Sequence, residues 1–138
     1  DMEDASVTDA TIDLHGRLRD AGLPAALTLQ AYRRRTMADL TTLVRGGGMV
    51  RLVKGAFAAG SDIAFTRQAE IKGNYRTLIS LMLSRAARDS GFRPVIATHD
   101  TALHTHAREQ AAANCWPPGS YEFEMLLGVR PDESAALA

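Results

Sequence analysis

The sequence predicts an α/β fold in which parallel strands alternate with helices. Short apolar runs follow one another along the chain, separated by longer amphipathic stretches, which is the pattern of repeated βα units. Glycine and proline residues mark the ends of most of these stretches. The chain has 138 residues, whereas a complete (βα)8 barrel takes about 250. The pattern therefore leaves two architectures open: an open, doubly wound sheet, or a segment of a (βα)8 barrel.

Four apolar runs have the length and composition of buried strands, at residues 25–31, 49–54, 95–98 and 121–125. Pro94 directly precedes the third run, and the start of a strand tolerates a missing backbone N–H. Asp1 stands where a further strand would end. We therefore expect five strands, counting the stub at Asp1.

Helical spacing of apolar residues fills the segments between these runs. A first helix carries Val7, Leu14, Leu18 and Ala21 on one face and ends before Gly22. The later helices are expected over 36–45, 71–86 and 101–113.

Further residues mark the start of the second helix and the two ends of the chain. Thr36 and Asp39 have the spacing of a capping box that opens the second helix. Pro131 is the expected first residue of a last helix, of which the chain contains only the beginning. The chain begins at Asp1 without an initiator Met, so we expect the fold to be incomplete at both ends.

The composition excludes several classes of function. Sixteen Lys and Arg residues balance sixteen Asp and Glu residues, so no basic surplus indicates nucleic acid as a partner. Cys115 is the only cysteine, which rules out an intrachain disulfide and fits a reducing, cytoplasmic location. Only Lys54 and Lys72 are lysines among the cations, a bias that indicates a bacterial source. No apolar run approaches the roughly 18 residues that cross a bilayer.

Polar residues at strand ends are the candidates for chemistry, because buried polar groups need partners. Gln30 ends its strand, and Arg51 shares the parity of Val53, which points its side chain to the face opposite Leu52. An inward Arg51 requires either a ligand or an internal ion pair with a carboxylate such as Asp1 or Glu124.

The run Thr98-His99-Asp100 follows a strand and enters a helix. It either contacts a ligand or serves as an N-cap (Thr98 or Asp100) with His99 in the loop. His104 and His106 are two apart on a helix and therefore diverge, so we expect no metal site there.

Five motifs together resemble the successive strand-end motifs of the proline dehydrogenase family, including the domain in bifunctional proline-utilisation proteins. They are Asp-Met-Glu-Asp at 1–4, Leu-Gln-Ala-Tyr at 29–32, Arg-Leu-Val-Lys-Gly-Ala-Phe at 51–57, Ala-Thr-His-Asp at 97–100 and Phe-Glu-Met-Leu-Leu-Gly-Val-Arg at 123–130. The resemblance spans essentially the whole chain. It implies that residues 1–138 are an internal part of a single (βα)8 barrel domain of the TIM type.

The resemblance also implies roles for individual residues. The family holds FAD noncovalently at the carboxyl ends of the strands. Asp1 then corresponds to an active-site aspartate and Arg51 to an arginine near the flavin N5. The remaining implied contacts are with the flavin at Met2, Gln30, Lys54, Gly55, Ala56, Thr98 and His99, and with the substrate at Phe57 and Leu126.

The implied reaction moves a hydride from L-proline to N5 of FAD, which gives 1-pyrroline-5-carboxylate. The electrons pass to a quinone-type acceptor, and a peripheral membrane association is implied only for the full-length parent. Position 57 is Phe where many members have Tyr. The family's substrate lysine, late tyrosine and arginine pair are missing here, so we expect the isolated chain to be inactive. Two alternatives are a flavin barrel of the methylenetetrahydrofolate reductase kind and a truncated or degenerate, non-catalytic fragment.

Overall fold

Strands and helices alternate along the chain in the computed structural model, which describes residues 4–129, 132 and 135. The strands are β1 (Ala26–Gln30), β2 (Gly48–Val53), β3 (Phe92–Ala97) and β4 (Glu122–Glu124). The helices are a short 3₁₀ turn η1 (Ala5–Val7), α1 (Thr8–Asp20), α2 (Thr36–Gly46), α3 (Gln68–Met82), α4 (Arg85–Asp89) and α5 (Thr101–Ala113).

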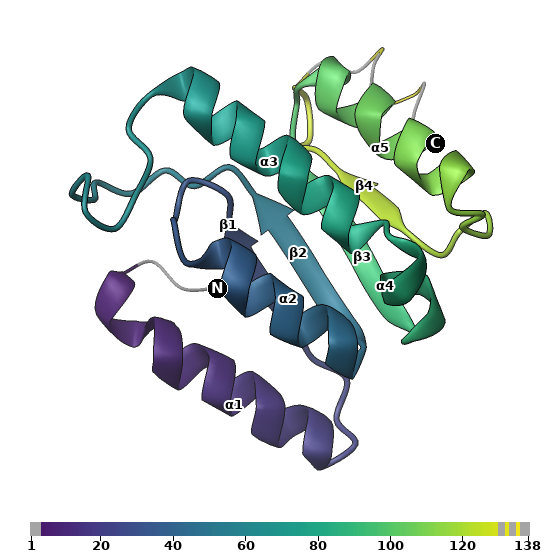
Figure 1. Cartoon of the computed structure of the whole chain (residues 1–138), viewed down its shortest axis with the longest axis horizontal. Coiled ribbons are helices and arrows are strands. Elements are labelled where there is room, and N and C mark those ends of the chain that lie inside the picture. Colours follow the sequence, from purple (N-terminus) through teal and green to yellow (C-terminus); the bar gives the residue numbers. More distant parts are fainter. Residues whose placement is uncertain (1–3, 130–131, 133–134, 136–138) are drawn as a thin grey trace.

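The four strands form one parallel sheet whose spatial order follows the chain order, β1-β2-β3-β4. Connections of one hand between successive parallel strands bring the helices of these connections to the same face of the sheet. Figure 1 shows this arrangement, with the helices in front and the sheet behind them. A doubly wound sheet would have helices on both faces. The predicted α/β fold of parallel strands alternating with helices is therefore confirmed, in the one-sided arrangement of a barrel segment.

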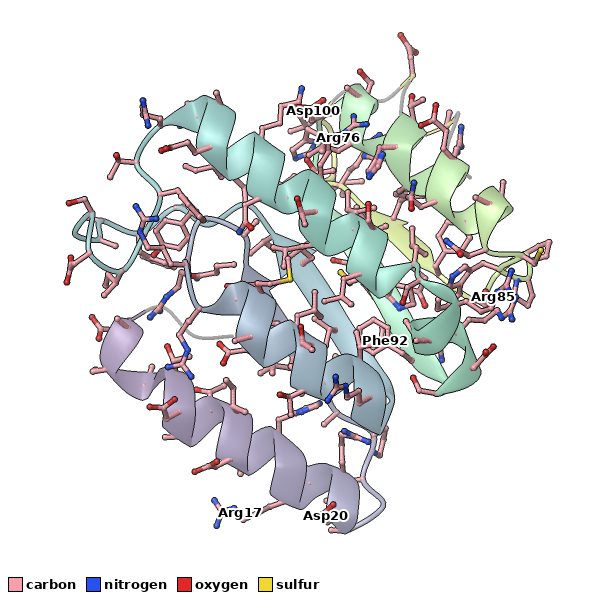
Figure 2. The ribbon with its side chains drawn as sticks, in the orientation of Figure 1. Arg17, Asp20, Arg76, Arg85, Phe92 and Asp100 are labelled. Carbon is pink, nitrogen blue, oxygen red and sulfur yellow. The ribbon has the colours of Figure 1, made fainter. Side chains whose placement is uncertain are left out.

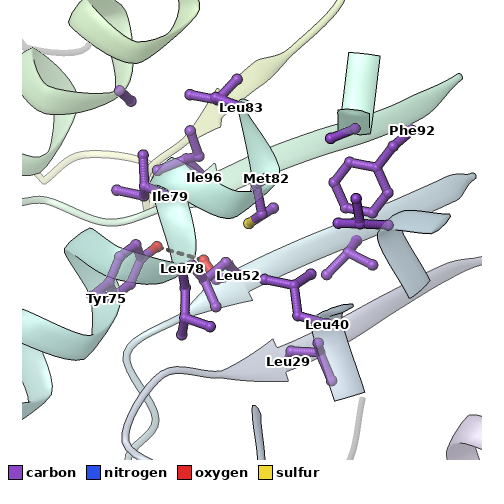
Figure 3. Packing of buried hydrophobic residues seen from close by; sticks show 14 of the residues in the cluster. Leu29, Leu40, Leu52, Tyr75, Leu78, Ile79, Met82, Leu83, Phe92 and Ile96 are labelled. Atoms are coloured by element: carbon purple, nitrogen blue, oxygen red, sulfur yellow. Dashed lines mark hydrogen bonds between the residues drawn. The ribbon is translucent and has the colours of Figure 1, made fainter. Parts of the chain in front are cut away.

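The two faces of the sheet differ in burial. Leu29 of β1, Leu52 of β2 and Ile96 of β3 point toward the helices and are almost fully buried. They pack against the apolar stripe of α3, including Tyr75, Leu78, Ile79 and Met82 (Figure 3). The opposite face carries half-buried residues such as Thr28 and Arg51, which are register partners in β1 and β2. Arg51 thus points to the face of the sheet opposite that of Leu52, as predicted.

The first helix buries a different face from the predicted one. Val7 and Leu14 are 44% and 48% exposed, whereas Thr8 and His15 are buried. His15 lies seven residues after Thr8, so the two share one helical face. Its Nε2 atom lies 3.3 Å from the carbonyl oxygen of Ala25, just before β1. This polar contact orients α1, and a pattern of apolar residues alone does not reveal it.

The predicted capping box at the second helix does not form. Arg35 occupies the N-cap position, and its guanidinium binds the Asp39 carboxylate at 2.8 Å. The Thr36 hydroxyl instead donates to the carbonyl oxygen of Gln30 at 2.6 Å, in a buried setting. The competing partners are stronger than the local cap, because one is a charged group and the other is a buried carbonyl that needs a donor.

Two other boundaries differ from the sequence prediction. The stripe expected over 71–86 is two helices, because Ser84 accepts a hydrogen bond from the N–H of Ala87 and starts α4. β3 begins at Phe92 rather than beside Pro94. Since β4 pairs only with residues from Val95 onward, Pro94 has a strand neighbour on one side only, which is the position where proline is tolerated. The prediction for 101–113 coincides with α5, and the expected helix start at Pro131 lies outside the described residues.

The two ends of the sheet are easily distinguished. Figure 2 labels Phe92, which starts β3, and Asp100, which follows the other end of β3 and precedes α5. The carboxyl ends of all four strands lie at the Asp100 end. Within the part of the chain that is described, none of the helices has the length and apolar character needed to cross a membrane.

Candidate functional site

The carboxyl edge of the sheet brings together residues from three connecting loops. Backbone pairing continues beyond β1 and β2, because the N–H groups of Ala31 and Tyr32 donate to the carbonyl oxygens of Val53 and Lys54 at 2.8 and 2.9 Å. The N–H of Thr98 donates to the carbonyl oxygen of Glu124 at 3.2 Å. These bonds fix the start of each loop relative to its neighbours.

A cavity of about 540 Å³, which we name the inner cavity, opens at this edge on the face opposite the helices. It unites eight residues to which the family resemblance assigns contacts. They are Gln30, Arg51, Lys54, Gly55, Ala56, Phe57, His99 and Leu126. Thr28 and Val53 complete its wall. Residues separated by almost a hundred positions in the sequence thus line one space.

A second cavity of about 710 Å³, the outer cavity, adjoins the first. Lys54 and His99 line both. Thr98 lines only the outer cavity, whereas Arg51 and Gln30 line only the inner cavity. Lys72 also lines the outer cavity, which therefore contains both lysines of the chain.

Arg51 forms an internal ion pair through its Nε atom with the carboxylate of Glu124. Both side chains are more than one third exposed, at 35% and 40%. This is one of the two arrangements that the sequence left open for an inward arginine. The pair spans from β2 to β4 across Val95 and Ala97 of β3, and Arg51 remains in the wall of the inner cavity.

The run from Thr98 to Asp100 acts as the entry to α5. One oxygen of Asp100, Oδ1, accepts from the N–H of Ala102 at 3.0 Å, so Asp100 is the N-cap. The other oxygen, Oδ2, lies 2.7 Å from Nζ of Lys72. The hydrogen bond from Lys72 holds the pKa of Asp100 below its ordinary value. The N–H of Leu126 lies 3.4 Å from Nε2 of His99, which joins the loops after β3 and β4.

Gly55 and Tyr32 determine the shape of the wall between β1 and β2. Gly55 has φ +96°, and a β-carbon there would lie 2.2 Å from the Tyr32 ring. The close approach therefore requires glycine. Sequence reasoning did not assign a role to Tyr32, although it ends one of the motifs that carry the resemblance. It also did not identify Lys72, whose partner lies in another loop.

Other predicted features have simple structural partners or are not described. Nε2 of His104 lies 2.9 Å from the carbonyl oxygen of Thr98, and Nε2 of His106 lies 2.9 Å from Oγ of Ser80, so the two imidazoles do diverge. Among the residues placed by the structure, no group of three or more His, Cys, Asp or Glu side chains could hold a metal ion. Asp1 and Met2 lie outside the described residues.

Comparisons of the sequence with a family profile and with curated proteins agree on one family. The profile of the proline dehydrogenase family matches residues 1–138. Proline dehydrogenase 1 of Bacillus subtilis (strain 168) is 29% identical over 138 residues, and proline dehydrogenase 2 of the same strain is 30% identical over 137. Proline dehydrogenase of Deinococcus radiodurans is 29% identical over 140 residues. These matches cover 99–100% of this chain and 44% of each relative.

A solved structure shows the same fold. It is proline utilization A from Bdellovibrio bacteriovorus, inactivated by N-propargylglycine, which matches with a TM-score of 0.75 at 22% identity. The match covers 90% of this chain and 15% of that one. Since the family profile matches the full length of the sequence, the chain belongs to the proline dehydrogenase family.

Proposed function

We propose that the protein carrying this chain is a FAD-dependent proline dehydrogenase that oxidises L-proline to 1-pyrroline-5-carboxylate. Residues 1–138 are then an internal part of its single barrel domain and supply mainly the flavin side of the site. The observation that carries the proposal is the inner cavity. It lies at the carboxyl ends of parallel strands, where barrel enzymes have their sites, and it gathers a cationic, an amide and an apolar group.

The chemistry of the donors suits FAD. A flavin ring has a polar edge and two apolar faces, and the attached pyrophosphate is anionic. Arg51 and Lys54 supply positive charge, and Gln30 supplies an amide. The outer cavity continues from Lys54 to Thr98 and His99, so Lys54 stands between the two cavities as a cation for the anionic pyrophosphate. A long ligand could thus extend from one cavity into the other, with Thr98 and His99 beside its ribityl–phosphate part.

Bound FAD supplies the redox chemistry by taking up a hydride from the proline ring. With FAD bound in the inner cavity, the guanidinium of Arg51 in its wall would stabilise the negative charge that develops on reduction. Phe57 and Leu126 offer an apolar wall to the proline ring. In this proposal Gly55 and Ala56 bring the backbone close to the flavin, Met2 contacts it, and Asp1 is the active-site aspartate.

The partners of the whole protein belong to the same proposal. Its substrate is L-proline, its electron acceptor is of the quinone type, and its location is the bacterial cytoplasm with peripheral association at the membrane. In this proposal the residues that grip the proline carboxylate lie outside this chain, which covers 44% of the length of the relatives.

Anaerobic bleaching of the flavin absorbance by L-proline tests the proposal in the full-length natural protein that carries these residues. Arg51→Met should lower the rate constant of flavin reduction by about two orders of magnitude and change the thermal transition little. Arg93→Met is the matched control, because Arg93 also points away from the helices and pairs with Glu122, at 3.0 Å, but does not line either cavity. Equal reduction rates for Arg51→Met and the parent would exclude the role of Arg51. A parent that binds no flavin would favour the non-catalytic alternative.

A further inference from the structure

Two ion pairs lie on the face of the sheet that points away from the helices. Arg51 of β2 pairs with Glu124 of β4, and Arg93 of β3 pairs with Glu122 of β4. Glu122 and Glu124 are two residues apart in one strand, so their side chains share a face and are separated by roughly 7 Å along it. The pairs are chemically alike, and they differ in their distance from the inner cavity.

The position of Glu124 relative to Arg51 is specific. Arg51 lines the inner cavity, whereas Glu124 does not. The Glu124 carboxylate accepts a hydrogen bond from Nε of the guanidinium, and no hydrogen bond to it from the two terminal nitrogens is found among the described residues. Arginine presents five N–H donors in a rigid plane. Holding Nε therefore fixes the plane and leaves the donors of the terminal nitrogens for a ligand in the cavity.

We infer that Glu124 is a positioning residue for Arg51 and that its charge adjusts the electron affinity of the group bound in the inner cavity. The inference rests on the proposed function. Glu124 has two separable effects: its oxygen orients the guanidinium, and its negative charge partly cancels the positive charge of Arg51. The first effect favours hydride uptake, and the second makes reduction of the bound flavin less favourable.

Two substitutions separate these effects. Glu124→Gln keeps an oxygen that can accept from Nε of Arg51 but removes the negative charge. The reduction potential of the bound flavin should therefore become more positive, corresponding to about a tenfold change in the equilibrium constant, or about 30 mV for a two-electron couple. Glu124→Ala removes the acceptor as well, so Arg51 is released and the rate of flavin reduction by proline should fall at least tenfold.

Glu122→Gln is the matched control. It removes the same charge from the same strand and the same face, but its partner Arg93 does not line the inner cavity. The potential should change less than half as much in this variant as in Glu124→Gln. A purely structural role of the ion pairs would give the two variants the same potential as the parent and would show only as a lower unfolding temperature.

The experiment measures the flavin reduction potential by equilibration with redox dyes in the full-length natural protein and the three variants, beside the dissociation constant for FAD. A potential that is equal in parent, Glu124→Gln and Glu122→Gln overturns the inference while leaving the proposed function intact. A potential that becomes more negative in Glu124→Gln also overturns it. A parent that binds no FAD instead overturns the proposed function itself, so the two failures are distinguishable.

Discussion

The hydroxyl of Tyr75 in α3 donates a hydrogen bond to the carbonyl oxygen of Leu52 in β2, with a donor–acceptor distance of 2.5 Å (Figure 3). The same hydroxyl lies 3.1 Å from the carbonyl oxygen of Ala97, the last residue of β3. Tyr75 is 1% exposed. It thus joins the longest helix to two adjacent strands close to the edge where both cavities open, and it also lines the outer cavity.

Tyr75→Phe should lower the free energy of unfolding by about 1–2 kcal/mol, because two carbonyl groups lose their shared donor in a buried site. Urea denaturation measures the change. Tyr121→Phe is a suitable control, since Tyr121 is a half-buried tyrosine whose ring packs edge-on against Phe123, and it should change stability by less than 0.5 kcal/mol or so. Equal losses in the two variants would contradict a special role for the Tyr75 hydroxyl.

Tyr75 also predicts how stability depends on pH. Burial raises the pKa of Tyr75 well above its ordinary value. Below pH about 10 the hydroxyl is protonated in both the folded and the unfolded chain, so its contribution is constant. Above that pH the unfolded chain releases the proton and the folded chain retains it, so stability falls by up to about 1.4 kcal/mol per pH unit. The Tyr75→Phe variant should show a smaller loss between pH 10 and 11 than the parent, and identical slopes would refute the assignment.

The positions of the strands, and the face of the sheet to which Arg51 points, could be predicted because both follow from local periodicity. The alternation of residues within 49–54 predicts that Arg51 and Leu52 point to opposite faces of the sheet. In the structure Leu52 is buried and Arg51 is half-buried. The same reasoning failed for α1. The face that it buries depends on the polar contact of His15 with the carbonyl oxygen of Ala25, and periodicity of apolar residues contains no information about that contact.

The site was predictable only in part for a similar reason. The rule that strand ends meet at one edge predicts that Gln30, Arg51 and Thr98 lie at one end of the sheet, and of these three Gln30 and Arg51 line the inner cavity. It does not predict that Thr98 faces the outer cavity instead, because that depends on the turn into α5. Nor does it identify Glu124 as a partner of Arg51, since that depends on the register between β2, β3 and β4.

Gly55→Ala should destabilise the protein by more than about 2 kcal/mol. The residue has φ +96°, and a β-carbon would lie 2.2 Å from the Tyr32 ring, so backbone strain and overlap add. Gly91→Ala is the matched control, because Gly91 has φ +75° with nothing within 4 Å of the added carbon, and only the backbone cost of about 1 kcal/mol remains. Thermal unfolding of both variants measures the difference. A Gly55 variant as stable as the Gly91 variant would show that the Tyr32 ring moves aside at no cost.

The two oxygens of Asp100 perform separate tasks, so two substitutions should separate them. Oδ1 caps α5 through the N–H of Ala102, and Oδ2 pairs with Lys72. Asp100→Ala removes both interactions and should cost about 1 kcal/mol, as loss of a helix N-cap generally does. Asp100→Asn retains a capping oxygen and loses only the attraction to Lys72, which is about half exposed. It should therefore cost no more than about 0.5 kcal/mol.

Salt provides the check on this division. The contribution of the ion pair should shrink in 1 M NaCl, where the Debye length is about 3 Å, whereas the cap contribution should persist. Urea denaturation of the parent and both variants at low and high salt measures the two contributions. The Asn variant should approach the parent at high salt while the Ala variant remains destabilised. If the Ala and Asn variants were equally stable at both salt concentrations, Asp100 would contribute no cap, and α5 would begin without help from this side chain.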